Sequence, residues 1–209
     1  MRFNYIIGRS TLVCLMMTGG IRFSSSMSAA SAMAVVRPKI TMYVFNYAQV
    51  PARVLRSAEK ETSRIFGHSR ISIVWINVDL EADSSPRCAL DSREQPCGML
   101  RIHPRPPNDT MSHEIAGYAF PGTPFASIIF DAVVEEAKSV ARSESLVLGH
   151  TMAHEIGHLF LPAGYHSPEG IMQARLNETS WRQADQGSLL FSSQEAEALR
   201  QHMLGLEPR

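Results

Sequence analysis

One segment of the sequence, residues 154–158, restricts the possible folds more than any other. It reads His-Glu-Ile-Gly-His and lies within an apolar stretch that extends from residue 146 to residue 160. On an α-helix, residues four apart differ by about 40° in direction and about 6 Å in height, so both imidazoles can face one point. Polar side chains on a buried helix need partners. We therefore predict a helix over residues 146–160 whose two histidines face a shared ligand.

The spacing of these histidines is typical of a zinc site. Zinc binds imidazole nitrogens at about 2.0–2.1 Å and lowers the pKa of a water in its open position to about 7. Glu155 lies about 100° further round the helix than His154, beside the ion rather than on it. We predict His154 and His158 as metal ligands, and Glu155 as the general base that later protonates the leaving amine. The alternative is a pair of core histidines without metal.

A third ligand should come from the chain that follows this helix. Pro162 and Gly164 end the helix and allow the chain to turn back. This return would bring His166 beside the first two histidines, and we predict His166 as the third ligand.

The same residues resemble a known family. His-Glu-Ile-Gly-His-Leu, followed by His-Ser-Pro-x-Gly-Ile-Met at residues 166–172, resembles the metzincin clan of zinc metallopeptidases. It resembles more closely an uncharacterised group of exported bacterial zinc-peptidase-like proteins, over residues 149–175. The resemblance implies a zinc ion bound by three histidines, with Met172 beneath it. The clan usually has glycine and its third histidine where this chain has Leu161 and Gly164. His166 comes two residues later, so the exit from the helix must differ.

A second zinc-peptidase pattern competes for the third ligand. Glu178 follows Asn177 and lies twenty residues after His158. This resembles the thermolysin-like (gluzincin) arrangement, in which such a pair on a second helix supplies the ligand, and residues 173–181 would form that helix. Both choices predict the same class of reaction.

Four further side chains are candidates for supporting roles. His150 lies about 12 Å of helix rise from His158, too far to share one ion, and should lie at the surface or support a ligand from outside. Met172 either forms the floor of the metal site or packs in the core. The candidates for hydrogen bonds to the ligand imidazoles are Ser167 and Asp131.

The rest of the chain alternates between strand and helix patterns. Alternating apolar, β-branched and aromatic residues predict strands over residues 39–47, 71–78, 98–103, 115–120 and 126–133. Helices are predicted from Pro51 to about Phe66, over residues 135–141, and from Ser192, which forms a capping box with Glu195. The first strand–helix–strand unit predicts a parallel pair. We expect an α+β (or α/β) fold, with a twisted mixed sheet packed on the active-site helix as in a minimal metzincin-like catalytic domain.

The N-terminal 34 residues have the pattern of an export signal. Arg2 and Arg9 precede an apolar stretch, and a region of small residues ends in Ala-Met-Ala at residues 32–34. We predict cleavage after Ala34, a single domain over residues 35–209, and a secreted or periplasmic location. A cytosolic leader is the alternative.

Cleavage would leave two cysteines, Cys88 and Cys97. An even pair in an exported chain favours a disulfide that closes a short loop. Two unpaired thiols are the alternative.

Composition narrows the class of function. Hydrophobic residues make up 44% of the chain and charged residues 19%, which excludes a disordered protein. Basic and acidic residues number 20 each. A protein that binds nucleic acid by neutralising its phosphates usually has an excess of basic residues, so we expect no nucleic-acid partner. The apolar runs are too short to cross a bilayer, so we expect no membrane insertion after signal cleavage. We expect a monomer.

Together these features predict a zinc-dependent endopeptidase with one catalytic zinc ion and a peptide or protein substrate. The substrate strand would pair with an edge strand at residues 117–120. The alternative is an exported zinc-binding module or an inactive peptidase relative. Glu155 favours the enzyme, because a structural zinc site needs no general base and is usually closed by four protein ligands.

Overall fold

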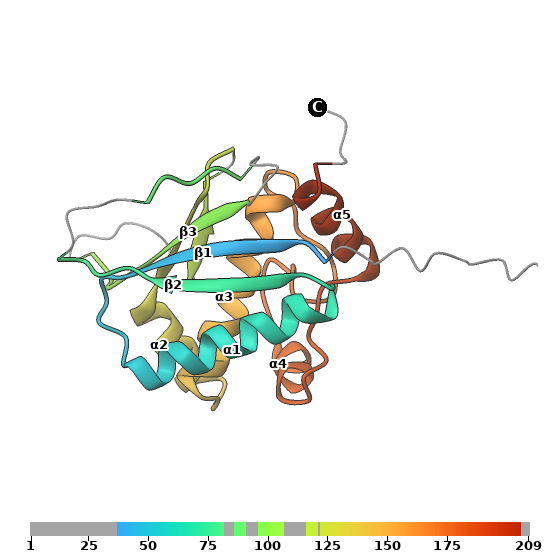
Figure 1. Ribbon diagram of the computed structural model, residues 1–209. Helices are drawn as coiled ribbons and strands as arrows, with labels where there is room; N and C mark the ends of the chain where they lie inside the picture. Colours follow the sequence, from blue (N-terminus) through green and yellow to red (C-terminus); the bar gives the residue numbers. More distant parts are fainter. Residues whose placement is uncertain (1–36, 82–85, 91–95, 107–115, 121, 206–209) are drawn as a thin grey trace, which may run out of the picture. The chain divides into compact units, whose positions relative to one another are not determined.

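A computed structural model describes residues 37–81, 86–90, 96–106, 116–120 and 122–205 of the 209-residue chain (Figure 1). The predicted signal segment lies outside these residues. The strands are β1 (Lys39–Asn46), β2 (Ser72–Asn77), β3 (Cys97–His103), β4 (Gly117–Ala119) and β5 (Phe125–Ile129). The helices are α1 (Ala52–His68), α2 (Phe130–Ser139), α3 (Glu144–Phe160), α4 (Glu178–Asp185) and α5 (Ser193–Met203). Within the described part of the chain, none of these helices is long and apolar enough to span a membrane.

The strands form one mixed sheet in the order β2-β1-β3-β5-β4. β1 runs parallel to β2 and to β3, and β3 runs parallel to β5. β4 lies at the edge and runs antiparallel to β5. The parallel β1–β2 pair connected by α1 confirms the predicted strand–helix–strand unit. A mixed sheet with five helices confirms the α+β expectation.

One face of the sheet packs against α1. Alternation along β1 buries Ile40, Met42 and Val44 completely or nearly so. Side chains of β2 on the same face bind α1 directly: Trp75 Nε1 donates to Ser63 Oγ at 2.8 Å. The apolar stripe of α1 is buried in the core at Leu55, Ala58, Ile65 and Phe66.

Helix α3 lies in the centre of the core, behind the strands in Figure 1. The Ser143 side chain caps its first turn by accepting a hydrogen bond from the Leu146 N–H. Gly149 allows α1 to approach closely, because a Cβ there would lie 3.0 Å from the Ala58 carbonyl oxygen. At the same crossing, Thr62 Oγ1 donates to the Gly149 carbonyl at 2.9 Å. This tight packing fixes the helix that carries the predicted ligands.

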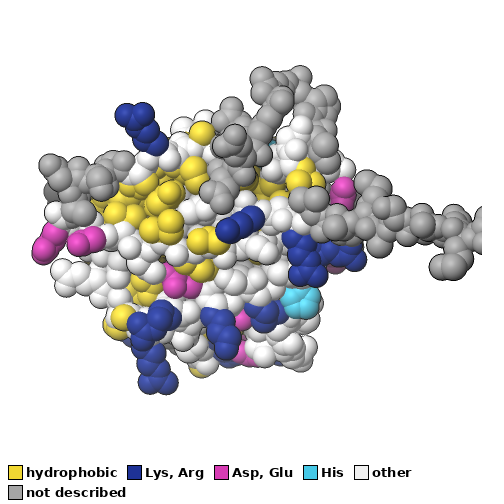
Figure 2. Space-filling view, viewed as in Figure 1, with side chains coloured by type: hydrophobic (Ala, Val, Ile, Leu, Met, Phe, Trp, Pro, Cys, Tyr) yellow, Lys and Arg dark blue, Asp and Glu magenta, His cyan; other side chains and the backbone are white. Residues whose placement is uncertain are grey.

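The opposite face of the sheet is partly exposed. Tyr47 follows β1 on this face, and its ring stacks on the rings of Phe45 and His103, with centroids 6.1 and 5.2 Å away. Ile76 of β2 is 40% exposed. Figure 2 shows hydrophobic side chains gathered over these strands.

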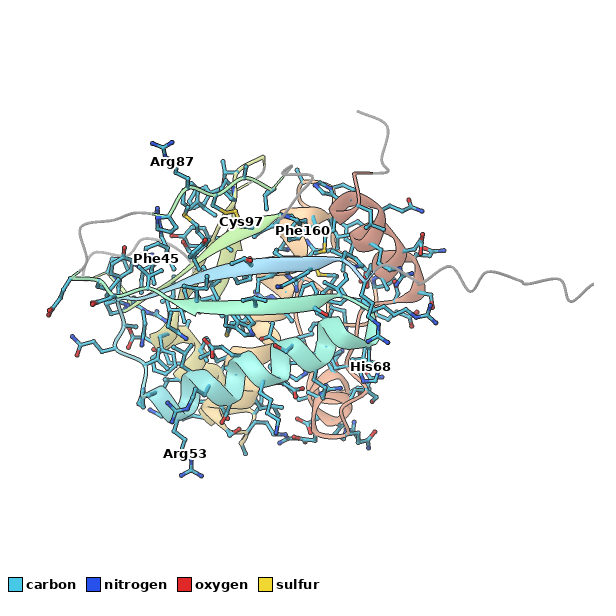
Figure 3. All side chains as sticks on the ribbon, in the orientation of Figure 1. Phe45, Arg53, His68, Arg87, Cys97 and Phe160 are labelled. Atoms are coloured by element: carbon cyan, nitrogen blue, oxygen red, sulfur yellow. A yellow bond between two sulfur atoms is a disulfide. The ribbon has the colours of Figure 1, made fainter. Side chains whose placement is uncertain are left out.

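A disulfide joins Cys88 to Cys97, the first residue of β3, as predicted (Figure 3). Their Cα atoms lie 5.5 Å apart, within the usual range. The Cys97 N–H also donates to the Ala89 carbonyl at 3.2 Å. The bridge therefore fixes the chain that leads into β3.

Three predicted boundaries are wrong. The strand expected over residues 126–133 ends at Ile129, and α2 begins at Phe130 rather than at residue 135. The β-branched residue Val133 favours a strand locally, but its burial beside Ala137, one helical turn later, decides for helix. The helix considered over residues 173–181 begins only at residue 178.

Candidate metal centre

Three histidine side chains meet at the C-terminal end of α3. His154 and His158 lie one turn apart on the helix, and His166 comes from the chain that follows it. One ring nitrogen from each lies within 4.8 Å of the other two. The Nε2 atoms of His154 and His158 are 3.0 Å apart. Across the described ranges, this is the cluster of histidine, cysteine and acidic side chains with a geometry suited to a metal ion.

The chain returns to the helix through the residues that the sequence singled out. The last helical residue, Phe160, is followed by Leu161 in an extended conformation. A turn then forms, in which the Tyr165 N–H donates to the Pro162 carbonyl at 3.0 Å. Gly164 has φ +69°, a left-handed conformation that glycine adopts without steric cost. This turn brings His166 to the other two histidines.

A second turn lies beneath the histidines and ends at Met172. The Ser167 N–H donates to the Met172 carbonyl at 2.9 Å and closes this turn. Met172 is fully buried, and a Cβ on Gly157 would lie 2.8 Å from its sulfur. The thioether therefore packs against α3 at Gly157, between the two predicted ligands His154 and His158, and it also belongs to the buried core. Both roles considered for Met172 are compatible with this position.

The backbone of this turn orients His154. Its Nδ1 lies 2.8 Å from the Ile171 carbonyl oxygen, and donates to it. The tautomer with a proton on Nδ1 leaves the Nε2 lone pair facing the cluster.

Burial keeps the helical histidines neutral. It lowers the pKa of His154, and it lowers the pKa of His158 to about 4 with help from the charges of His154 and His166. A neutral imidazole has the free lone pair that a metal ion needs. Both side chains are therefore ready to bind a cation at neutral pH.

Glu155 lies beside the cluster and is 5% exposed. Its Oε2 has no hydrogen-bond partner among the described residues. Burial raises the pKa of its carboxyl to about 8. The edge strand lies directly against it, because a Cβ on Gly117 of β4 would lie 2.6 Å from Glu155 Cγ. An orphaned carboxylate oxygen next to three converging imidazoles fits a site that binds a cation and a polar reactant.

The rival ligand Glu178 is placed elsewhere. It occupies the first turn of α4, which Asn177 caps through hydrogen bonds from the N–H groups of Thr179 and Ser180. Its side chain is 63% exposed and pairs with Arg142 at 3.5 Å. The Asn-Glu sequence therefore marks a helix start rather than a ligand site.

Ser167 and Asp131 were the candidates for hydrogen bonds to the ligand imidazoles, but both side chains bond to other groups. Ser167 Oγ donates to the Glu169 carbonyl at 2.7 Å. Asp131 accepts a hydrogen bond from the Arg105 N–H.

Of the two positions expected for His150, at the surface or in support of a ligand, the surface position is wrong, because His150 is fully buried. Its Nδ1 donates to the Leu146 carbonyl at 2.9 Å, and its Nε2 lies 3.7 Å from Glu61 Oε1 on α1. The ring of Trp181 packs edge-on against it. His150 thus belongs to the contact between α1, α3 and α4.

The sequence did not indicate that Glu195 contacts Tyr165, the residue before His166. Glu195 is 1% exposed, and its Oε2 accepts the Ser192 N–H at 2.7 Å as the predicted capping box requires. Its Oε1 accepts a hydrogen bond from the Tyr165 hydroxyl at 3.3 Å. A capping box predicts the first bond but gives no signal for the second.

No family model and no curated protein matches this sequence. Among solved structures, the chain is similar to a zinc-dependent peptidase from Methanocorpusculum labreanum, with 17% identity, a TM-score of 0.48, and coverage of 76% of this chain and 99% of that one. It is similar to archaemetzincin from Methanopyrus kandleri, with 15% identity, a TM-score of 0.48, and coverage of 80% and 96%. It is also similar to archaemetzincin from Archaeoglobus fulgidus complexed with malonate, with 15% identity, a TM-score of 0.43, and coverage of 76% and 99%.

Proposed function

We propose that this protein is a zinc-dependent endopeptidase with His154, His158 and His166 as ligands and Glu155 as general base. The observation that carries this proposal is the convergence of three imidazole nitrogens beside the buried carboxyl group of Glu155. Glu155 lies on the same helix as His154 and His158.

The donor set suits zinc. Tetrahedral coordination with bonds of about 2.0–2.1 Å places the ligand nitrogens about 3.4 Å apart. The observed separations, 3.0 Å for the helical pair and at most 4.8 Å within the cluster, are close to that size. Three protein ligands also leave one position open, which distinguishes a catalytic zinc site from a closed structural one.

Bound zinc would supply Lewis acidity, which polarises a scissile carbonyl and activates water. Glu155 would take the proton from that water and pass it to the amine that leaves. In the metal-free protein, burial raises the pKa of the Glu155 carboxyl to about 8. The charge of a bound cation would lower this pKa and so favour the carboxylate that accepts the proton.

The edge strand β4 supports a peptide as substrate. Among the described strands, β4 pairs with β5 alone, so its other backbone edge could pair with an extended peptide. Gly117 of β4 touches Glu155, which would place a paired peptide next to the general base.

Hydrolysis of a mixed peptide library, with and without a zinc chelator, tests this proposal. We expect cleavage by the wild-type protein, loss of cleavage with the chelator, and recovery when zinc is restored. Glu155→Gln should bind zinc and lose turnover, whereas the matched variant Glu178→Gln should keep it. Cleavage that ignores the chelator, or full activity of Glu155→Gln, would contradict the proposal. A protein that binds zinc and cleaves nothing would support a non-catalytic zinc module instead.

We also propose that the protein is exported. The N-terminal pattern, the resemblance of residues 149–175 to an exported bacterial group, and the Cys88–Cys97 disulfide support this. Expression of the full chain in a bacterium should yield a periplasmic or secreted product whose N-terminal residue is Val35. A cytoplasmic product that retains Met1 would contradict it.

A further inference from the structure

We propose that Glu195 is a positioning residue of the metal site, and that it holds the segment carrying His166 through the hydroxyl group of Tyr165. This inference rests on the proposed zinc site and adds a function for the N-terminal end of α5.

The Glu195 carboxylate joins two segments. Its Oε2 accepts the Ser192 N–H at 2.7 Å, and its Oε1 accepts the Tyr165 hydroxyl at 3.3 Å. With 1% exposure, Glu195 would be costly to bury without such partners. The capping box fixes the carboxylate on α5, so the second oxygen presents a fixed acceptor to Tyr165.

His166 is the ligand that most needs external support. His154 and His158 are held by the backbone of a buried helix, whereas His166 is exposed and follows a turn with a left-handed glycine. Tyr165 is its direct neighbour in the chain and is partly buried against the core. A fixed Tyr165 side chain therefore limits the positions that the His166 backbone can take.

The residues before α5 support the other side of the site in the same way. The Leu190 carbonyl accepts the Ile171 N–H at 3.0 Å, and the Ile171 carbonyl accepts the bond from His154 Nδ1. Leu190 thus holds the turn beneath His154, and Glu195 holds the segment that carries His166.

Glu195 is an acidic side chain held against the residue that precedes His166. A divalent cation on three neutral imidazoles would keep its full charge, and a fixed carboxylate beside the segment that carries a ligand would stabilise it. Glu195 would therefore favour metal binding both by geometry and by charge.

Three variants separate these contributions. Tyr165→Phe removes only the hydroxyl. Glu195→Gln can keep both hydrogen bonds, with its amide donating to the Tyr165 oxygen, but it removes the charge. Ser192→Ala is the matched control, because it removes the other half of the capping box and leaves the bond between Tyr165 and Glu195 in place.

The measurements are zinc affinity by competition with a chromophoric chelator, the visible spectrum of the cobalt-substituted protein, and the thermal unfolding of the metal-free protein. We expect Tyr165→Phe and Glu195→Gln each to weaken zinc binding by about 10–100-fold, the range for groups that support a ligand from outside. Tyr165→Phe should also shift the cobalt bands, because the position of His166 changes. Ser192→Ala should lower the unfolding temperature and leave zinc affinity and the cobalt spectrum unchanged.

Two results would overturn the inference, and they are distinguishable. If wild-type protein binds zinc but Tyr165→Phe and Glu195→Gln bind it equally well, the positioning role is wrong and the zinc site stands. If wild-type protein binds no zinc, the proposed function fails, and the inference fails with it.

Discussion

His154 Nδ1 donates a hydrogen bond to the Ile171 carbonyl oxygen at 2.8 Å. This contact joins the helix that carries two of the proposed ligands to the turn that ends at Met172. Because it fixes both the tautomer and the ring orientation of His154, the position of one ligand depends on the packing of a segment 17 residues away.

Gly157→Ala should destabilise the protein. The new Cβ would lie 2.8 Å from the Met172 sulfur and 3.0 Å from Phe191 Cε1, so the turn beneath the metal site must shift. Overpacking of this kind costs about 1–3 kcal/mol. Chemical denaturation measures it, with Gly67→Ala as the matched helical control, since a Cβ there would meet nothing within 4 Å. Equal stability of the two variants would show that Gly157 is not tightly packed.

Gly117→Ala should impair catalysis without removing zinc. The added methyl group would lie 2.6 Å from Glu155 Cγ and would displace the proposed general base. Displacement of a catalytic group by about 1 Å can cost about 100-fold in rate. Measured kcat should fall by about that factor while the zinc content of the purified variant stays at the wild-type value. Unchanged kcat would mean that Glu155 does not depend on β4 for its position.

The contribution of Glu155 to the stability of the metal-free protein should fall as the pH rises from about 4.5 to about 8. Burial raises the pKa of Glu155 from 4.5 to about 8, so in this range the folded state keeps a proton that the unfolded state releases. This contribution is full below pH 4.5 and falls by an amount on the order of 4 kcal/mol by pH 8. The lowered pKa values of His154 and His158 act in the opposite direction, so the Glu155 contribution is read against a variant that lacks it.

Glu155→Gln is the control for this effect, because it removes the titrating group and keeps the shape of the side chain. Metal-free denaturation curves across this pH range should show the wild-type protein losing stability relative to the variant. Parallel profiles for the two proteins would contradict the burial of an unpaired Glu155 carboxyl.

Removal of the disulfide should destabilise the fold and leave the site intact. The bridge closes a short loop with a sequence separation of 9 residues, which corresponds to about 2–3 kcal/mol. Cys88→Ser combined with Cys97→Ser should lower the free energy of unfolding by about that amount. Reductant should lower the unfolding temperature of the wild-type protein and not that of the double variant. An equal response of both proteins to reductant would argue against the bridge.

The parts of this structure that follow a simple period were predictable from the sequence. The apolar stripe of α3 and the four-residue spacing of His154 and His158 both predict a helix, because both have its period. The return of His166 was predictable from Pro162 and Gly164, which end the helix. β1 and β2 have the alternation of half-buried strands, and their lengths with α1 between them predict parallel pairing.

Other features depend on contacts between distant segments, which no local pattern encodes. Val133 has a strand preference, yet it is helical because α2 buries it beside Ala137. The Asn177–Glu178 pair was compatible with a ligand-bearing helix, but it caps α4 and places Glu178 at the surface. The contact of Gly117 with Glu155 likewise joins residues of an edge strand and a helix.

The metal content of the purified protein tests the central claim most directly. Native mass spectrometry should find one zinc ion per chain in the wild-type protein and in Glu178→Ala, and little or none in His166→Ala under the same conditions. This result would support the assignment of His154, His158 and His166 as the ligands. No stoichiometric zinc in the wild-type protein, or loss of zinc from Glu178→Ala but not from His166→Ala, would contradict it.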